Sequence, residues 1–185
     1  LHVAGLKFAI AIPESAALTR RLVLAAILFR ILLLPSLPLQ EVDVYRYLWD
    51  GAVATEGVSP FRFSPQQVLQ ADSSTPSASD LNRLIRLRKE SPTLREVLSR
   101  IHYPALTTVY PPVSQAVFAV AAVITPRSAS LSTRVVVFKS LLMVMDLATL
   151  CLVIRLLRRC GLHCGWCVLY GWCPLVLKEF ANSCH

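Results

Sequence analysis

Acidic, basic and aromatic residues gather in one short segment, 41–51, which reads Glu-Val-Asp-Val-Tyr-Arg-Tyr-Leu-Trp-Asp-Gly. If the segment is helical, the i, i+3, i+4 and i+7 spacing places four of its side chains on one face: Asp43, Arg46, Tyr47 and Asp50. A carboxylate there can act as a general base toward a hydroxyl group, and an arginine beside it can bind a phosphate leaving group. The aromatic residues have a simpler explanation, because tyrosine and tryptophan also anchor proteins at membrane surfaces.

The composition around this segment is that of an integral membrane protein. Of the 185 residues, 55% are hydrophobic and 16% are charged, whereas about 25% are charged in an average soluble domain. This composition excludes a disordered chain. The net charge of +8 is spread between apolar segments, so we predict no nucleic-acid partner. All six cysteines lie between Cys151 and Cys184 rather than along the chain, which argues against a disulfide framework.

Four apolar segments are predicted to cross or enter the bilayer, since a helix needs about 20 residues to span it. They are residues 22–38, 112–126, 135–157 and 161–177, of which the second and fourth are short and bounded by proline. The sequence therefore predicts an all-α, multi-spanning helical bundle. We expect residues 1–185 to form a single membrane domain that is part of a longer protein.

A polar stretch, 41–111, separates the first two apolar segments and is predicted to be a long extracytoplasmic loop. Its first part, 41–51, is expected to be helical with Gly51 as its stop, and 57–80 is expected to be irregular. Residues 80–102 predict two short amphipathic helices broken at Pro92, the second started by a capping box of Thr93 and Glu96. Their basic faces favour helices lying on the membrane surface, and the alternative is a pair of helices packed in a subdomain.

The orientation in the membrane is left open by the basic residues. Arg20 and Arg21 favour a cytoplasmic start to the first span. Strict alternation of four spans would then place the basic end of the third span outside, against the positive-inside rule, at Arg155, Arg158 and Arg159. One short segment is therefore re-entrant, or the number of spans differs by one.

Ionisable residues also lie inside the apolar segments, where they are costly and often functional. We favour a structural pairing of Arg30 with Asp146, and expect Lys139 to extend toward the membrane surface. The alternative is a transporter-like protein whose Arg30 and Asp146 line a pathway. The cysteines and His163 suggest a zinc site, but cysteine in an apolar segment usually behaves as a small hydrophobic residue, so we predict no metal and no cofactor.

Several spaced motifs resemble one family. Residues 43–51, followed by Gly-Val-Ser-Pro-Phe-Arg-Phe-Ser-Pro at 57–65, are similar to the first extracytoplasmic loop of polyprenyl-phosphate-dependent glycosyltransferases of the GT-C fold. The nearest resemblance is to bacterial mannosyltransferase-like members, which implies a multi-pass protein of the inner cell membrane. The segment 108–115, which contains Tyr-Pro-Pro at 110–112, and the segments 172–179 and 182–185 resemble later blocks of that family in the same order.

The resemblance implies inverting transfer of a mannose-like sugar from a polyprenyl phosphate in the bilayer to a glycan or lipid acceptor outside the cytoplasm. Asp43 would then be the catalytic base, with Asp50 as a second acidic residue of the site. The residues that would bind the substrate are Arg46, Tyr47, Lys178, Glu179 and His185. No metal is implied.

The chain also departs from the family pattern. Val42 stands where a second acidic residue is common, Ser59 and Cys173 where asparagine precedes proline, and Cys184 where glycine precedes the histidine. These departures leave open a non-catalytic membrane protein or an inactive fragment. The concentration of charge at 41–51, rather than in the middle of the spans, favours the glycosyltransferase over a transporter.

Overall fold

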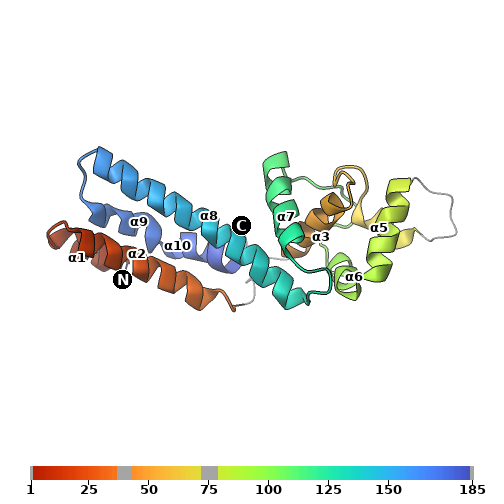
Figure 1. Cartoon of the computed structure of the whole chain (residues 1–185), viewed down its shortest axis with the longest axis horizontal. Coiled ribbons are helices and arrows are strands. Elements are labelled where there is room, and N and C mark those ends of the chain that lie inside the picture. Colours follow the sequence, from red (N-terminus) through yellow and green to blue (C-terminus); the bar gives the residue numbers. More distant parts are fainter. Residues whose placement is uncertain (1, 37–42, 72–78, 184–185) are drawn as a thin grey trace. The chain divides into compact units, whose positions relative to one another are not determined.

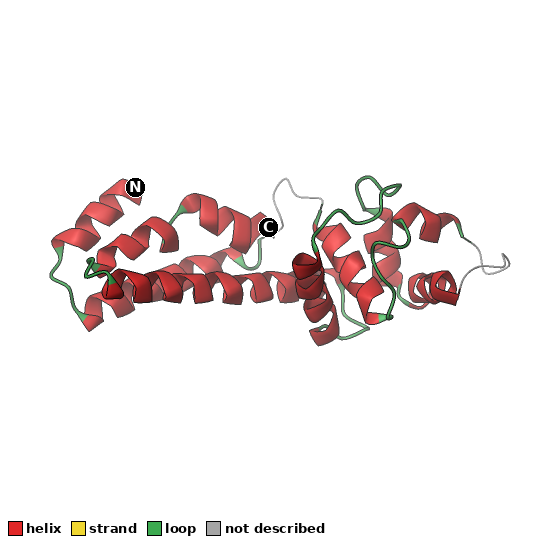
Figure 2. Ribbon diagram, turned by 90° about the horizontal axis from the view of Figure 1, so that it is seen from above, coloured by secondary structure: helices red, strands yellow, loops and turns green. Residues whose placement is uncertain are grey.

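Helices make up all the regular structure in the parts of the chain that the computed structural model describes, which are residues 2–36, 43–71 and 79–183 (Figure 2). The all-α prediction is confirmed for these residues. The chain divides into two compact units. Unit 1 consists of residues 1–39 and 139–185, and unit 2 consists of residues 40–138.

Unit 1 contains helices from both ends of the chain (Figure 1). Ser15 caps the N-terminus of the second helix, since its hydroxyl group accepts a hydrogen bond of 3.0 Å from the Leu18 amide. The long eighth helix starts in unit 2 and continues through unit 1 from Lys139. The elements are α1 (His2–Ala11), α2 (Ala16–Leu33), α8 (Leu131–Arg159), the 3-10 helix η1 (Cys164–Cys167), α9 (Val168–Gly171), α10 (Pro174–Val176) and the π-helix η2 (Leu177–Ser183).

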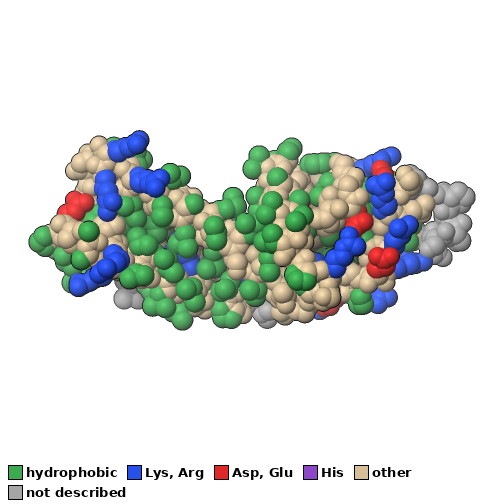
Figure 3. Space-filling view, viewed as in Figure 1, with side chains coloured by type: hydrophobic (Ala, Val, Ile, Leu, Met, Phe, Trp, Pro, Cys, Tyr) green, Lys and Arg blue, Asp and Glu red, His purple; other side chains and the backbone are tan. Residues whose placement is uncertain are grey.

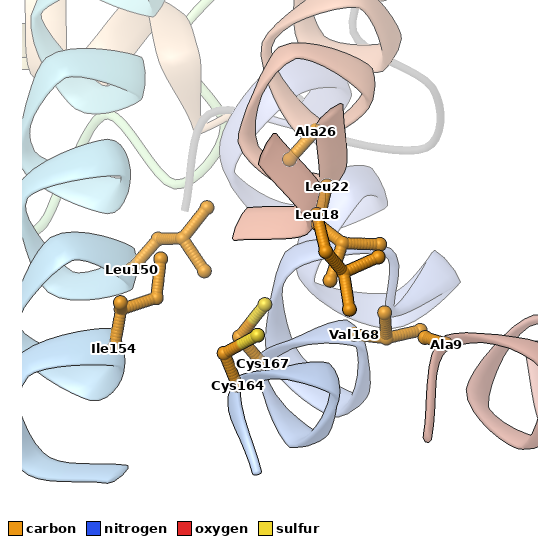
Figure 4. Close-up of a cluster of buried hydrophobic side chains, with 9 residues drawn as sticks. All are labelled: Ala9, Leu18, Leu22, Ala26, Leu150, Ile154, Cys164, Cys167 and Val168. Carbon is orange, nitrogen blue, oxygen red and sulfur yellow. The ribbon is translucent and has the colours of Figure 1, made fainter. Parts of the chain in front are cut away.

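The core of unit 1 is a cluster of buried apolar side chains contributed by α1, α2, α8, η1 and α9 (Figure 4). Cys164 and Cys167 point into this cluster beside Leu150 and Ile154 and are almost completely buried. The two thiols therefore pack as small hydrophobic groups. Both ring nitrogens of His163 have protein partners, since its Nδ1 accepts from the Gly165 amide at 3.0 Å and its Nε2 lies 3.0 Å from the Ile12 carbonyl oxygen.

A buried ion pair links α2 to α8, as the sequence predicted. Arg30 and Asp146 are 0% and 1% exposed, and the Arg30 Nε donates to an Asp146 carboxylate oxygen. The Arg30 Nη1 also donates to the carbonyl oxygens of Ala26 and Gly171, both at 2.9 Å. The Tyr170 hydroxyl donates to the second Asp146 oxygen at 2.7 Å. The pair is thus closed by protein groups on several sides, which favours the structural role.

Lys139 does not extend to a surface, so that prediction was wrong. Its side chain is completely buried and its ammonium group lies against the C-terminal end of α2. There it donates to the carbonyl oxygens of Leu33, Leu34 and Ser36 at 2.8–3.1 Å. These are carbonyl groups that a helix end leaves without intrahelical partners, and a cation is favoured at the negative end of the helix dipole.

One helix within the described residues, α8, is long and apolar enough to cross a bilayer. Its 29 residues are about 43 Å long at 1.5 Å per residue. The predicted segment 161–177 is not one continuous helix but several short ones, η1, α9 and α10. The predicted segment 112–126 forms a helix of 13 residues that belongs to unit 2.

The described residues of unit 2 form five complete helices and the first turns of α8. In this unit α3 packs most extensively against α7. Gly51 permits the close approach, because a Cβ atom at this position would lie 2.3 Å from the Phe118 carbonyl oxygen. Gly51 is therefore a packing residue inside α3 and not the predicted stop. The helices are α3 (Val44–Thr55), α4 (Pro65–Gln70), α5 (Ser79–Glu90), α6 (Pro92–Ser99) and α7 (Pro112–Ile124).

The two amphipathic helices predicted around Pro92 are present as α5 and α6, but their apolar faces are not free. Leu84 and Ile85 of α5 and Val97 and Leu98 of α6 are all at most 3% exposed. The apolar stripe is therefore used for packing within unit 2, as in the alternative of two helices packed in a subdomain. The cap differs from the prediction, since the Ser91 hydroxyl, not a capping box at Thr93, accepts from the Leu94 amide.

Candidate functional site

The predicted catalytic carboxylate, Asp43, lies at the N-terminal end of α3. It is the residue immediately before the first helical position and is partly exposed. The Tyr110 hydroxyl donates a hydrogen bond of 2.9 Å to the Asp43 Oδ2. The positive end of the α3 dipole also favours a negative charge at this place. Asp43 is thus held in position while remaining accessible to a substrate.

Tyr110 is placed beside Asp43 by the start of α7. Pro111 is the N-cap of that helix and Pro112 its first residue, a position where proline is favoured. Burial raises the pKa of Tyr110 to about 12, and its hydrogen bond to Asp43 and the charge of that carboxylate act in the same direction. The hydroxyl group therefore stays protonated at neutral pH and serves as a donor to the carboxylate.

Tyr47 lies in the aromatic core behind the site. Its side chain is buried, with its ring centroid 4.9 Å from that of Tyr110 in an edge-to-face arrangement. It also stacks on Phe118 at 4.6 Å. Tyr47 therefore fixes the ring of Tyr110, and so the direction of the hydrogen bond to Asp43, from within unit 2.

Arg46 and Asp50 form a buried ion pair one turn apart on α3. The Arg46 Nε donates to Asp50 Oδ1 at 3.1 Å, and the Arg46 Nη2 donates to the Leu106 carbonyl oxygen at 2.9 Å. The Gln115 amide nitrogen donates both to Asp50 Oδ2 at 3.1 Å and to the Thr108 hydroxyl at 2.7 Å. This network joins α3 to α7 and to the segment between α6 and α7.

The environment of Asp50 differs from that of Asp43. Asp50 is 2% exposed. Burial raises its pKa above the ordinary value, and the opposing effects of Arg46, Thr108 and Gln115 are each smaller than that of burial. Protein donors enclose the Asp50 carboxylate. Its geometry therefore suits a residue that holds its neighbours in place and does not itself contact a substrate.

The segment that carries Tyr110 has exposed apolar side chains. Tyr103, Leu106, Val109 and Val113 are each between 55% and 76% exposed. Tyr103 also has a positive φ of 52°, which is rare for a bulky residue and marks local strain. Arg46 holds this segment through the Leu106 carbonyl oxygen. An apolar surface therefore adjoins the accessible carboxylate.

The remaining predicted site residues do not lie with Asp43 in unit 2. Lys178 and Glu179 are in η2 of unit 1, where the Lys178 Nζ lies 3.1 Å from a Glu179 carboxylate oxygen. His185 lies outside the described residues. In the parts of the chain that the structure describes, no three His, Cys, Asp or Glu side chains gather as ligands of a metal ion.

Sequence reasoning missed the residues that organise the site from α7 and from the segment before it. Tyr110 was noted as part of a motif, but its contact with Asp43 spans 67 positions and has no local sequence signal. Thr108 and Gln115 are the two ends of the same motif, and the sequence assigned neither of them a role. A glutamine one turn into a strongly apolar helix is the signal that was available, because a buried amide requires polar partners.

Comparison with known proteins identifies a family. The sequence pattern that defines a family described as "Alpha-(1->6)-mannopyranosyltransferase, N-terminal domain" matches residues 3–185. No curated protein and no solved structure matches the chain.

Proposed function

The chain belongs to the alpha-(1->6)-mannopyranosyltransferase family, and from this membership we propose that it takes part in transfer of mannose from a polyprenyl phosphate to a glycan or lipid acceptor. Membership itself supports glycosyl transfer in general. The observation that carries the finer proposal is the arrangement of Asp43, a partly exposed carboxylate that Tyr110 orients at 2.9 Å. The GT-C fold is part of the same proposal.

In the proposed reaction Asp43 takes the proton from the attacking hydroxyl group of the acceptor. The acceptor oxygen forms a bond to the anomeric carbon of mannose as the bond between that carbon and the phosphate oxygen breaks. The configuration inverts, and the polyprenyl phosphate leaves with the electron pair. Tyr110 keeps the carboxylate aimed, and the helix N-terminus favours its charged form.

The lipid part of the donor would lie along the apolar side chains that adjoin the carboxylate. Leu106, Val109 and Val113 are mostly exposed, and an isoprenoid chain or the bilayer itself can cover such side chains favourably. We give Arg46 and Asp50 a positioning role, since both are buried and paired with each other. Lys178, Glu179 and His185 remain candidates for contacts with phosphate or sugar.

We further propose that α2 and α8 cross the membrane in opposite directions. The Arg158 Nη2 lies 3.4 Å from the Thr19 hydroxyl oxygen, so the end of α8 lies beside the start of α2. Arg20 and Arg21 therefore share one end of unit 1 with Arg158 and Arg159. With these two spans alone, both basic groups are cytoplasmic and the conflict with the positive-inside rule disappears.

The surface of unit 1 supports this arrangement. Hydrophobic side chains dominate the face of unit 1 seen in Figure 3, and Lys and Arg side chains gather toward the end where α8 terminates. The most exposed apolar side chains of α2 and α8 are Leu24, Leu28, Ile31 and Leu32, and Val144, Met145, Leu152 and Leu156. Since residues 40–138 connect the opposite ends of the two spans, unit 2 is extracytoplasmic in this proposal.

The topology predicts which of two exposed positions can be labelled from outside. A Ser99→Cys variant, in a background whose native cysteines are replaced, should react with an impermeant maleimide added to intact cells. The matched control restores only the native Cys160, which is exposed and directly follows Arg159. It should react only after permeabilisation, and the reverse pattern would invert the proposed orientation.

The donor is tested with membranes that contain the full-length protein carrying this domain. We expect radiolabelled mannose to pass from polyprenyl-phosphate mannose, but not from a nucleotide-activated mannose, to an α-(1→6)-linked mannobiose acceptor. Membranes without the protein serve as the control. Transfer from the nucleotide sugar when lipid synthesis is blocked would contradict the proposed donor.

A further inference from the structure

Unit 2 contains a second candidate site, a pocket at the opposite end of α3 from Asp43. The pocket has a volume of about 310 Å³ and is lined by the last turn of α3 and by parts of α5, α6, α7 and α8. This volume is within the range of small-molecule sites, ~300–1,000 Å³. The nearest lining residue on α3 is Ala52, nine positions after Asp43, which is about 14 Å along the helix axis. The pocket is therefore distinct from the site of the proposed reaction.

A buried arginine in this pocket lacks part of its hydrogen bonding. Arg134 is 6% exposed, and its Nη2 donates to the Arg127 carbonyl oxygen at 2.8 Å. Among the described residues its Nε has no partner. Buried polar groups of this kind are normally satisfied, and Arg134 also lies in the first turn of α8, where a cation is disfavoured by the helix dipole. An acceptor oxygen supplied by a ligand would relieve this cost.

The charges around the pocket indicate which kind of ligand fits. Arg134 and Arg127 are balanced by Glu56 and Glu90, and Arg127 pairs with Glu56 at 3.4 Å. An anion would meet two carboxylates, and a cation would meet the buried guanidinium group. Hydroxyl groups avoid both penalties, because each can donate to a carboxylate and accept from an arginine.

The other lining side chains are consistent with a polar ligand that also has apolar faces. Ser91 and Ser128 add hydroxyl groups, while Ala52, Leu94 and Ala122 provide an apolar wall. We propose that this pocket binds an uncharged, hydroxyl-rich ligand, namely a sugar unit of an oligosaccharide. The choice of mannose as that sugar rests on the proposed function. The inference that the pocket binds a sugar rests on its lining residues alone.

The test measures binding of α-(1→6)-linked mannotriose by ligand-detected NMR. The protein is the whole chain in lipid nanodiscs, without sugar-headed detergent. Ser128→Trp places a large side chain at an exposed position of the lining and should lower binding at least tenfold. The matched control, Ser99→Trp, adds the same side chain at an exposed position of α6 outside the pocket and should bind like the wild-type chain.

A second variant addresses the chemistry of recognition and not only the space. Glu90→Gln keeps the shape but removes the charge, and should weaken mannotriose binding about tenfold because hydrogen bonds to charged groups are the stronger ones. Equal binding by the wild-type chain and Ser128→Trp would overturn the proposal. So would binding of inorganic phosphate in this pocket in preference to the sugar.

The failure of this inference can be told from failure of the proposed function. Mannotriose binding that is lost in Ser128→Trp but kept in Asp43→Asn would support the pocket whether or not transfer is observed. Transfer that depends on Asp43, with no effect of Ser128→Trp on mannotriose binding, would leave the reaction intact and remove the pocket.

Discussion

Asp43→Asn is expected to lower mannosyl transfer by about 10²–10⁴-fold, the usual loss when a general base is removed. The change keeps the shape of the side chain and an oxygen that can accept from the Tyr110 hydroxyl, so the surrounding contacts should remain. The assay is transfer of radiolabelled mannose in membranes, normalised to the amount of protein measured by blotting.

The matched control is Asp50→Asn on the same helix. Because Asp50 is buried and pairs with Arg46, this change should lower protein stability more than it lowers activity per folded molecule. Near-full activity of Asp43→Asn together with complete loss in folded Asp50→Asn would show that the two roles are exchanged. If both variants stay active, neither carboxylate is the base.

The largest expected effect on stability comes from the buried pair in unit 1. Asp146→Ala leaves Arg30 as an uncompensated buried charge, and breaking such a pair on one side costs about 3–5 kcal/mol. The free energy of unfolding is measured by denaturant titration of the purified chain in detergent. Tyr170→Phe is the milder comparison, because it removes the hydroxyl that donates to the second Asp146 oxygen but leaves the ion pair in place.

A double variant separates the cost of an unpaired charge from the value of the pair. Arg30→Met with Asp146→Leu fills a similar volume without charge, and such replacements are often neutral or stabilising. We therefore expect the double variant to recover most of the stability lost by Asp146→Ala. A double variant as unstable as the single one would indicate that the ion pair is itself required.

Interactions that repeat at short spacing could be predicted from the sequence. The spacing of Arg46 and Asp50 predicted a shared helix face, and the two side chains do form an ion pair one turn apart. Pro92 correctly predicted the break between α5 and α6. Arg30 and Asp146 are far apart in sequence, but two opposite charges in apolar segments have few other partners, so their pairing was also predictable.

Features that depend on tertiary packing could not be predicted in the same way. A glycine in a helix suggests a stop, but at Gly51 the close backbone of α7 requires it. A basic face on α5 and α6 suggests a membrane surface, but whether the opposite apolar face is free depends on helices distant in sequence. Lys139 likewise finds its carbonyl partners at the end of α2, more than 100 positions away.

The candidate site shows the same limit. Local spacing placed Asp43, the residue before α3, on one face with three side chains of that helix, but it did not separate the partly exposed carboxylate from the buried one. That difference comes from Gln115 and Thr108, which lie 65 and 58 positions from Asp50 and enclose it. Asp43 is partly exposed because it lies at the end of the helix, where Tyr110 is its one hydrogen-bond donor among the described residues.

The most direct test of the role of Asp43 is a single-turnover measurement. The full-length protein is first loaded with polyprenyl-phosphate mannose, its bound donor is quantified, and saturating α-(1→6)-mannobiose is then added. We predict that Asp43→Asn binds as much donor as the wild-type protein but transfers mannose about 10²–10⁴-fold more slowly. Transfer at the wild-type rate from the loaded variant would contradict the assignment of Asp43 as the base.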